Sequence, residues 1–257
     1  MPTPFPSLFV SHGAPTLVID PCPTHDFLKS LGSRLGRPRG VVCATAHWTA
    51  PAPVLSATAH PETIHDFWGF PDELYRMRYE APGDAALAGR ARELLAEAGI
   101  GAGIDAERGL DHGTWVPLKL MYPDAEVPVA QLSVQPRLGP EHHLAMGRAL
   151  APLRDEGVLV MGSGSLTHNL RDLRTPGTPP VPYAVDFARW AVDMVESGRE
   201  ADLTAYPEKG PAGARNHPTS EHFLPLLVAM GAGERRGRIV HDDMMYGVLS
   251  MGAFLWD

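Results

Sequence analysis

The stretch Val158-Leu159-Val160-Met161 is short and fully apolar, which is typical of a strand buried on both faces of a sheet. Three further runs are predicted to be core strands: residues 8–10, 41–44 and 127–134. Amphipathic stretches lie between these runs and predict helices: residues 25–35, 84–98, 141–154, 182–197 and 219–230. This alternation predicts an α/β fold with a central, largely parallel or mixed sheet flanked by helices.

Length and composition favour one domain. The chain has 257 residues, with 44% hydrophobic and 20% charged residues, and it contains no internal repeat or low-complexity tract. The segment 174–182 holds four prolines and is expected to form an irregular loop near the site. We therefore predict a single catalytic domain over residues 1–257.

Charge and cysteine content exclude several partners. The net charge of −8 disfavours nucleic acid and anionic membrane surfaces, which attract basic proteins. The N-terminal segment lacks the pattern of a signal peptide, and no apolar run is long enough for a membrane span. Cys22 and Cys43 lack a metal- or redox-type spacing, so we expect free thiols. These features predict a soluble, cytoplasmic protein, a monomer or small homo-oligomer.

The histidines are the unusual part of the composition, because 12 occur and several follow predicted strands. His12, His47 and His168 lie just beyond the ends of three core strands, where open α/β sheets bind ligands. His222 is expected in the first turn of the last long helix, within reach of the same crevice. Because imidazole is a common ligand of zinc and iron, the pattern predicts one mononuclear metal site.

Other histidines carry less signal. His112 has glycine neighbours and follows Asp111, which suits either a substrate or acid/base group or a structural role. His65 beside an aromatic cluster is a weaker candidate. Six histidines are expected on the surface or in loops, without a role: His25, His60, His142, His143, His217 and His241. The chain has no G-x-S-x-G, phosphate-loop or H-E-x-x-H motif, which disfavours the enzymes that use them.

Six ordered blocks contain these histidines and resemble one family. The blocks are Ser11-His12-Gly13-Ala14-Pro15, Ala46-His47-Trp48, IHDFWGFP at 64–71, GLDHGTWVP at 109–117, GSGSLTHNL at 162–170 and HPTSEHFLPLL at 217–227. Together they resemble the class III extradiol ring-cleaving dioxygenases, and more closely the subgroup that includes DOPA 4,5-dioxygenase. The blocks extend over nearly the whole chain.

The resemblance implies an α/β fold around a single non-haem metal, Fe(II) or Zn(II). It implies that His12, His47 and His222 are the ligands, and that His168 is either a fourth ligand or the acid/base residue. Glu221 precedes His222, and neighbours on a helix point about 100° apart, so only one is expected to face the metal. We assign that place to His222.

The implied activity is extradiol ring cleavage of a catechol-type, DOPA-like aromatic diol with O2. His168 would exchange protons with the substrate, and His112 would orient it. Two alternatives stay open: a non-enzymatic metal-binding relative of the Memo type, and a zinc hydrolase that uses metal-bound hydroxide.

Residues near the motifs leave the substrate open. Five aromatic residues either wall a pocket or belong to the core: Trp48, Phe67, Trp68, Phe70 and Trp115. Arg171 and Arg174 follow the His168 block and are either anchors for an acidic substituent or solvated surface charges. The sequence alone does not identify the catechol.

Overall fold

A mixed sheet of eight strands forms the centre of the molecule. The computed structural model describes residues 3–257. The strands of the sheet are β1 (Ser7–Ser11), β2 (Gly40–Thr49), β3 (Val54–Ser56), β4 (Gly103–Asp105), β5 (Val129–Val134), β6 (Val158–Gly164), β7 (Arg238–His241) and β10 (Ala253–Trp256). Their order is β4-β3-β5-β2-β6-β1-β10-β7, and the inner strands β5, β2, β6 and β1 pair in parallel. Antiparallel pairs join β3 to β5, β10 to β1 and β7 to β10, so the expected mixed α/β fold is confirmed.

Helices cover both faces of this sheet. The longer ones are α1 (Pro23–Leu35), α3 (Ala85–Glu97), α4 (His112–Met121), α5 (Gly139–Leu150), α7 (Pro182–Ser197) and α11 (Leu224–Ala232). The short ones are η1 (Pro15–Val18), α2 (Asp72–Arg76), η2 (Pro136–Leu138), α6 (Pro152–Asp155), η3 (Leu170–Asp172), α8 (Glu200–Thr204), α9 (Tyr206–Lys209) and α10 (Gly213–Asn216). A separate two-stranded ribbon is formed by β8 (Met244–Met245) and β9 (Leu249–Ser250).

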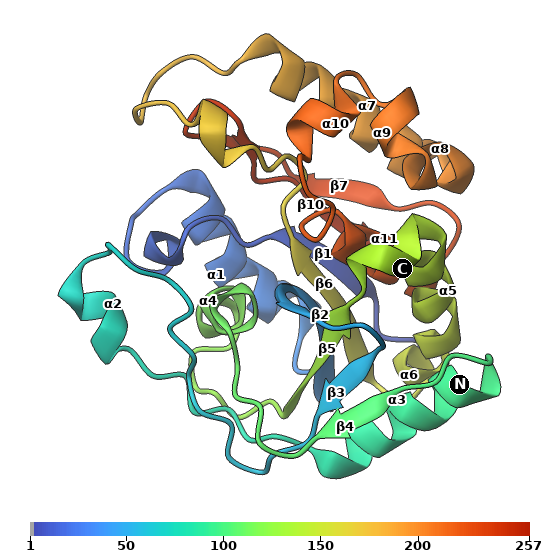
Figure 1. The fold of residues 1–257 in the computed structure, drawn as a ribbon. Helices are drawn as coiled ribbons and strands as arrows, with labels where there is room; N and C mark the ends of the chain where they lie inside the picture. The colour runs from blue at the N-terminus through green and yellow to red at the C-terminus, as the bar shows by residue number, and fades with distance from the viewer. Residues whose placement is uncertain (1–2) are drawn as a thin grey trace.

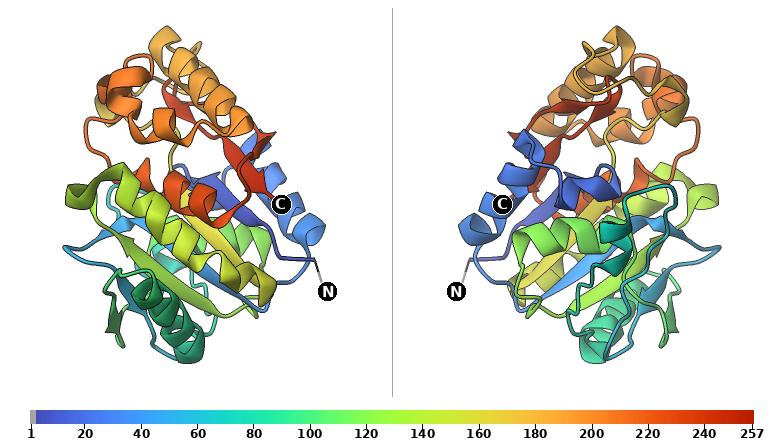
Figure 2. Two further views of the ribbon diagram at one scale, coloured as in Figure 1. Left: turned by 90° about the vertical axis from the view of Figure 1, so that its right-hand side faces the viewer. Right: turned by 90° about the vertical axis from the view of Figure 1, so that its left-hand side faces the viewer.

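The layers follow from the alternation of side chains along the strands. Val41 and Cys43 of β2 pack with α1 and α4 in one core, whereas Val42 and Ala44 pack with α3, α5 and α11 in another. Figure 1 shows α1 and α4 on one side of the sheet and α5 and α11 on the other. Helices α7 to α10 lie beyond β7, at the upper end of both views in Figure 2.

Several predicted boundaries were wrong. The helix expected over 219–230 begins only at Leu224, so His222 lies in the turn before α11 rather than in its first turn. The helix expected over 141–154 is divided into α5 and α6, because Pro152 cannot donate a backbone hydrogen bond and begins a new helix. Strand β2 runs on to Thr49, so His47 lies within it, at a shift in its pairing register with β5.

The helices of the described chain include none that is both long and apolar enough to cross a membrane.

Candidate metal centre and active-site cleft

Three histidines meet at the carboxyl ends of the parallel strands. His12 follows β1, His47 lies near the end of β2, and His222 lies before α11. One ring nitrogen of each lies within 4.8 Å of the others, and the Nε2 atoms of His12 and His47 are 3.0 Å apart. The chain thus brings together the three residues that the resemblance implies as ligands.

Hydrogen bonding determines which nitrogen of His12 faces this meeting point. The hydroxyl of Ser163, in β6, donates to the carbonyl of Gly113. Since that bond uses its only proton, the Ser163 oxygen accepts from Nδ1–H of His12 at 3.0 Å. The Nε2 atom of His12 therefore carries a free lone pair.

Carboxylates impose the same tautomer on the other two histidines. Nδ1 of His47 lies 3.3 Å from Oδ2 of Asp66, and Nδ1 of His222 lies 3.1 Å from Oε1 of Glu221. Carboxylate oxygens only accept, so each ring carries its proton on Nδ1 and presents Nε2 as a lone pair. An oxygen partner behind each imidazole is the usual outer contact of histidine metal ligands.

The donor set fits a divalent metal ion. Nε2 of His222 is buried and has no hydrogen-bond partner in the described chain, which would be costly without a ligand. Two nitrogens each about 2.1 Å from one ion and at right angles lie ~3 Å apart, as those of His12 and His47 do. Three buried or half-buried imidazoles thus form a candidate mononuclear metal centre.

Burial keeps these imidazoles neutral, as ligands must be. Loss of solvent, followed by repulsion from neighbouring imidazoles, lowers the pKa of His12 and of His222 well below the ordinary range. Burial and the nearby His112 also lower the pKa of His47 to about 3, against the opposing effect of Asp66.

Glycines allow the chain to approach closely enough to build the centre. A Cβ on Gly164 of β6 would lie 2.2 Å from the carbonyl oxygen of His222. The same carbonyl accepts from the N–H of Ser165 at 2.9 Å, which holds the turn before α11 against β6. On the opposite side, a Cβ on Gly113 would lie 2.9 Å from the ring of His47. Any larger residue at either position would displace a candidate ligand.

His168 lies beside the centre rather than in it. Its ring stacks on that of His222, with centroids 3.5 Å apart and planes 9° from parallel. Its potential ligand atoms group with Glu221 and His222, not with those of His12 and His47. The backbone N–H of His168 donates to the carbonyl of Asn216 at 2.9 Å, which holds the loop after β6 in place, and burial lowers the pKa of His168 to about 4.

His112 and His47 share one carboxylate. Nδ1 of His112 lies 3.0 Å from Oδ1 of Asp66, and the same oxygen accepts from the backbone N–H of His112 at 3.0 Å. Burial acts to raise the pKa of Asp66, but hydrogen bonding and charge interaction with His112 bring it down to about 2. His112 is the buried first residue of α4, and its ring centroid is 3.9 Å from that of His47.

These groups lie in a cleft of about 670 Å³. Its histidines are His12, His47, His112, His168 and His222. Its apolar wall is formed by Phe67, Trp68, Phe70, Leu170, Leu173, Tyr246 and Leu249. A planar diol can therefore reach the imidazoles while its remaining surface contacts hydrocarbon.

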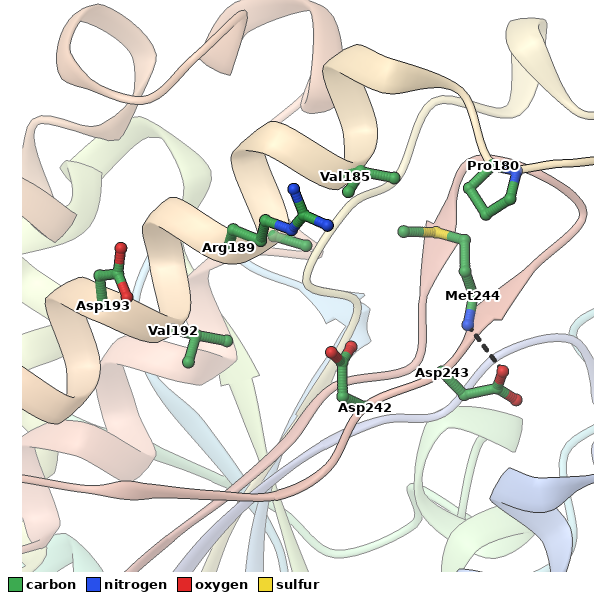
Figure 3. A pocket seen from close by; sticks show the side chains of 9 residues that line it. Pro180, Val185, Arg189, Val192, Asp193, Asp242, Asp243 and Met244 are labelled. Carbon is green, nitrogen blue, oxygen red and sulfur yellow. Dashed lines mark hydrogen bonds between the residues drawn. The ribbon is translucent and has the colours of Figure 1, made fainter.

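A second hollow, of about 320 Å³, differs in chemistry (Figure 3). It lies between α7 and the chain that enters β8, and Arg189, Asp193, Asp242 and Asp243 are among the residues that line it. None of its lining residues is a histidine or a cysteine, and none belongs to a group of potential metal ligands in the described chain. It is therefore not the predicted site.

Some sequence assignments differ from the structure. His143, expected at the surface or in a loop, lies on α5 and is 0% exposed, whereas His217 lies in a loop as expected but is 5% exposed. Of the five aromatic residues near the motifs, Phe67, Trp68 and Phe70 line the cleft, whereas Trp48 and Trp115 are buried and do not. The weaker candidate His65 also stays outside the cleft, with Nε2 3.1 Å from the carbonyl of Met77.

The roles of Asp66 and Ser163 were missed. Asp66 stands within one of the quoted blocks, beside His65, and Ser163 lies in the GSGS segment. An aspartate next to a candidate histidine is a weak signal, but such carboxylates often orient metal-bound imidazoles. Nothing local in the sequence indicates that Ser163 contacts His12, because 151 residues separate them.

The fold and the cluster together define an α/β protein with a histidine-built candidate metal centre. Residues 6–254 match the family described as the catalytic LigB subunit of aromatic ring-opening dioxygenase, and the chain belongs to this family. The prediction of an extradiol ring-opening enzyme is thereby confirmed, which disfavours the non-enzymatic and hydrolase alternatives. This family is metal-dependent, so the histidine cluster is its candidate metal site.

Relatives extend over almost the whole chain. The protein named 4,5-DOPA dioxygenase extradiol from Beta vulgaris is 42% identical, with 96% of this chain and 95% of that protein covered. The protein of the same name from Escherichia coli K12 is 40% identical, with 97% and 93% covered. A solved structure of an uncharacterized Escherichia coli K12 protein has a TM-score of 0.83 at 34% identity, covering 98% of this chain and all of that one.

Proposed function

We propose that this chain cleaves the ring of a catechol-type substrate with dioxygen, next to the diol, in the cleft that contains the five histidines. The observation that carries the proposal is a group of three imidazoles, each with one ring nitrogen within 4.8 Å of the others, which line a cleft with an apolar wall. The relatives named for DOPA ring cleavage support a catechol as the substrate class.

His12, His47 and His222 would hold the metal through Nε2. We propose Fe(II), because ring cleavage by dioxygen requires a redox-active ion and zinc has no redox chemistry. When bound, the ion supplies Lewis acidity that favours the ionised diol, together with the redox capacity needed for reaction with dioxygen. Ser163, Asp66 and Glu221 hold the three rings in the required tautomer through contacts of 3.0 to 3.3 Å.

His168 is proposed as the acid/base residue rather than a fourth ligand. Its stacking on His222 puts it at the edge of the centre, and its ring lines the cleft. It would accept a proton from a diol hydroxyl and return one later, a role for which imidazole is suited. His112, whose Nδ1 contacts Asp66, would use its other nitrogen to orient the diol.

The overall reaction balances without a further reductant. One ring carbon–carbon bond adjacent to the diol breaks, and both atoms of dioxygen enter the product. The ring therefore opens to an aldehyde at one end and a carboxylate at the other. The electrons that reduce dioxygen come from the substrate. The protein's own contribution is to bind the diol, to move its protons through His168 and to exclude water with the apolar wall.

Oxygen uptake tests the proposal directly. Protein loaded anaerobically with Fe(II) is given a panel of catechols in air, while dioxygen consumption and the visible spectrum are followed. Stoichiometric oxygen uptake with a yellow ring-opened product supports the proposal. No product from any catechol would overturn it. Metal analysis of protein purified without added metal, followed by the same assay with Zn(II), tests the assignment of Fe(II).

The proposal extends to the setting of the enzyme. We propose one catalytic domain over residues 1–257, a monomer or small homo-oligomer, in the cytoplasm. Cys22 and Cys43 are both free thiols, which suits a reducing compartment. Light scattering tests the oligomeric state, and cell fractionation tests the cytoplasmic location.

A further inference from the structure

The wall of the cleft limits the kind of catechol that fits, and this inference rests on the proposed function. We propose that the enzyme prefers catechols whose ring substituent is uncharged and apolar, and that Trp68 and Leu170 hold that substituent. The relatives are named for DOPA, whose side chain carries a carboxylate and an ammonium group. The residues that line the cleft of this chain include no lysine or arginine.

Exposed apolar side chains are concentrated at the mouth of the cleft. In the described chain, the large hydrophobic residues that are strongly exposed are Trp68 (87%), Leu170 (56%), Leu138 (48%), Leu173 (44%) and Ile104 (38%). Three of these five line the cleft. Hydrocarbon exposed together at the rim of a site is typical of a surface that is covered when an apolar ligand binds.

The residues that line the cleft offer no cation to a carboxylate. Among them the charged side chain is that of Asp66, and its oxygens already contact His47 and His112. An anionic substituent would find positive charge there only on the proposed metal ion, where the diol itself binds. It would also lose its hydration without gaining an ion pair.

The arginines near the cleft are engaged elsewhere or do not line it. Arg108 lies next to β2, but it pairs with the buried Asp111 at 3.2 Å and stacks over Trp48 at 4.7 Å. Arg171 and Arg174 follow His168 along the chain, yet both are exposed and neither lines the cleft. Their role as anchors, left open by the sequence, is not favoured by this arrangement.

Matched substrates test the preference. 4-Propylcatechol and 3-(3,4-dihydroxyphenyl)propionate differ mainly in the charge at the end of the chain. Each methylene buried in the cleft should raise kcat/KM roughly two- to fourfold, so 4-propylcatechol should exceed catechol by about tenfold or more. We expect 4-propylcatechol also to exceed the propionate and DOPA by at least about tenfold, since their charges stay unpaired. Equal or higher kcat/KM for the charged substrates would overturn the inference.

Variants locate the preference. Trp68→Ala and Leu170→Ala should each lower the ratio of kcat/KM for 4-propylcatechol to that for catechol, by roughly three- to tenfold. Leu138→Ala, at a comparably exposed leucine that does not line the cleft, should leave this ratio unchanged. An unchanged ratio in both cleft variants would contradict the assignment of these residues. If Arg171→Ala or Arg174→Ala lost turnover of DOPA but kept turnover of 4-propylcatechol, that arginine would anchor a charged substituent, and the inference would fail.

A binding measurement separates this inference from the chemistry. Anaerobic titration of Fe(II)-loaded protein gives a Kd for each substrate without turnover, and the same order of preference is expected. If no catechol is cleaved in air, the proposed function fails. If catechols are cleaved but the charged ones bind more tightly, only the present inference fails.

Discussion

Two sets of buried histidines use their nitrogens in opposite ways. At the carboxyl ends of the strands, His12, His47 and His222 each have an oxygen behind Nδ1 and present Nε2 to the centre. On α5, His143 is fully buried, donates from Nδ1 to the carbonyl of Gly139 at 2.7 Å, and accepts at Nε2 from the N–H of Gln135 at 2.9 Å. A ring with both nitrogens satisfied stabilises the fold, whereas a ring with one free lone pair is available to a ligand.

The difference shows why burial alone does not identify a site. His217 is also buried, and its Nδ1 has no hydrogen-bond partner in the described chain, but its Nε2 lies 2.9 Å from the carbonyl of Leu166 and its ring packs among Phe187, Tyr206 and Phe223. His217 belongs to no group of potential metal ligands in the described chain. Convergence of lone pairs, rather than the number of buried histidines, marks the candidate centre.

The largest effect on metal content and turnover is expected when His12, which presents a free Nε2 lone pair, is replaced. His12→Ala should lose both the metal and turnover, because two imidazoles and an unfilled gap replace a three-nitrogen site. Metal content after Fe(II) loading and desalting, together with oxygen uptake, measures both. The matched control is His143→Ala, which removes an equally buried imidazole and should keep one metal per chain when assayed well below its unfolding temperature. Retention of a full metal equivalent by His12→Ala would show that the two sets do not differ as described.

The stacked histidine should separate chemistry from metal binding. His168→Ala is expected to retain the metal but to lower kcat by roughly 10²–10⁴-fold, the usual contribution of a positioned acid/base group. The measurement is steady-state oxygen uptake on protein of verified metal content. If His168→Ala loses its metal, then His168 is a fourth ligand and the acid/base assignment fails.

A smaller effect on metal binding is expected when Asp66, which contacts Nδ1 of the candidate ligand His47, is changed. In Asp66→Asn, the amide can accept from only one of the two Nδ1–H groups that the carboxylate faces on His47 and His112. If its NH2 group faces His47, that ring must move its proton to Nε2, the atom proposed to bind the metal. We expect metal affinity to fall roughly 10- to 100-fold.

The control for this variant comes from the second hollow in Figure 3. Asp193→Asn changes a carboxylate that lines that hollow and belongs to no group of potential metal ligands in the described chain. Metal affinity, measured by competition with a chelator of known affinity, should equal that of the unchanged protein. Equal affinities in Asp66→Asn and Asp193→Asn would contradict the role given to Asp66.

The sequence predicts the helices, and the position of His12, that depend on local pattern. The helix ranges 84–98 and 182–197 agree closely with α3 and α7, because periodicity and end signals are local. His12 was correctly expected just after a core strand, since its apolar run ends there. The short strands β3, β4 and β7 were missed, because pairing partners rather than their own residues define them, and the apolar run of β10 was overlooked.

The features of the site that the sequence did not predict depend on long-range contacts. The Nε2 lone pair of His143 is occupied because the N–H of Gln135 donates to it, whereas that of His12 is free because Ser163 contacts Nδ1 instead. No local pattern in the sequence encodes these contacts. The pattern placed His222 within reach of the crevice but wrongly inside a helix, and the family resemblance then implied its role as a ligand. The opening of the cleft at Trp68 was equally hidden, because an aromatic residue beside a motif fits a core as well as a rim.

The smallest effect concerns stability and its dependence on pH. His143→Leu removes two hydrogen bonds to backbone groups that stay buried, so at pH 7.5 the free energy of unfolding of metal-free protein should fall by about 1–3 kcal/mol. Burial, against the hydrogen bond to Gly139, lowers the pKa of His143 to about 4 in the folded protein. In the unfolded chain the ordinary pKa is about 6.5, so the unfolded state takes up the proton first as the pH falls.

The stabilisation that neutral His143 provides is therefore complete above pH ~6.5 and is lost as the pH falls toward the folded-state value of about 4. Over that window the unchanged protein loses up to roughly 3 kcal/mol that His143→Leu cannot lose, so the difference between them should narrow or close. Urea unfolding at pH 7.5 and pH 5 measures it. His60→Leu, at an exposed histidine, should show no such narrowing. A difference that stays constant between the two pH values would mean that burial does not hold His143 neutral, and the contrast with the metal-facing histidines would then rest on position alone.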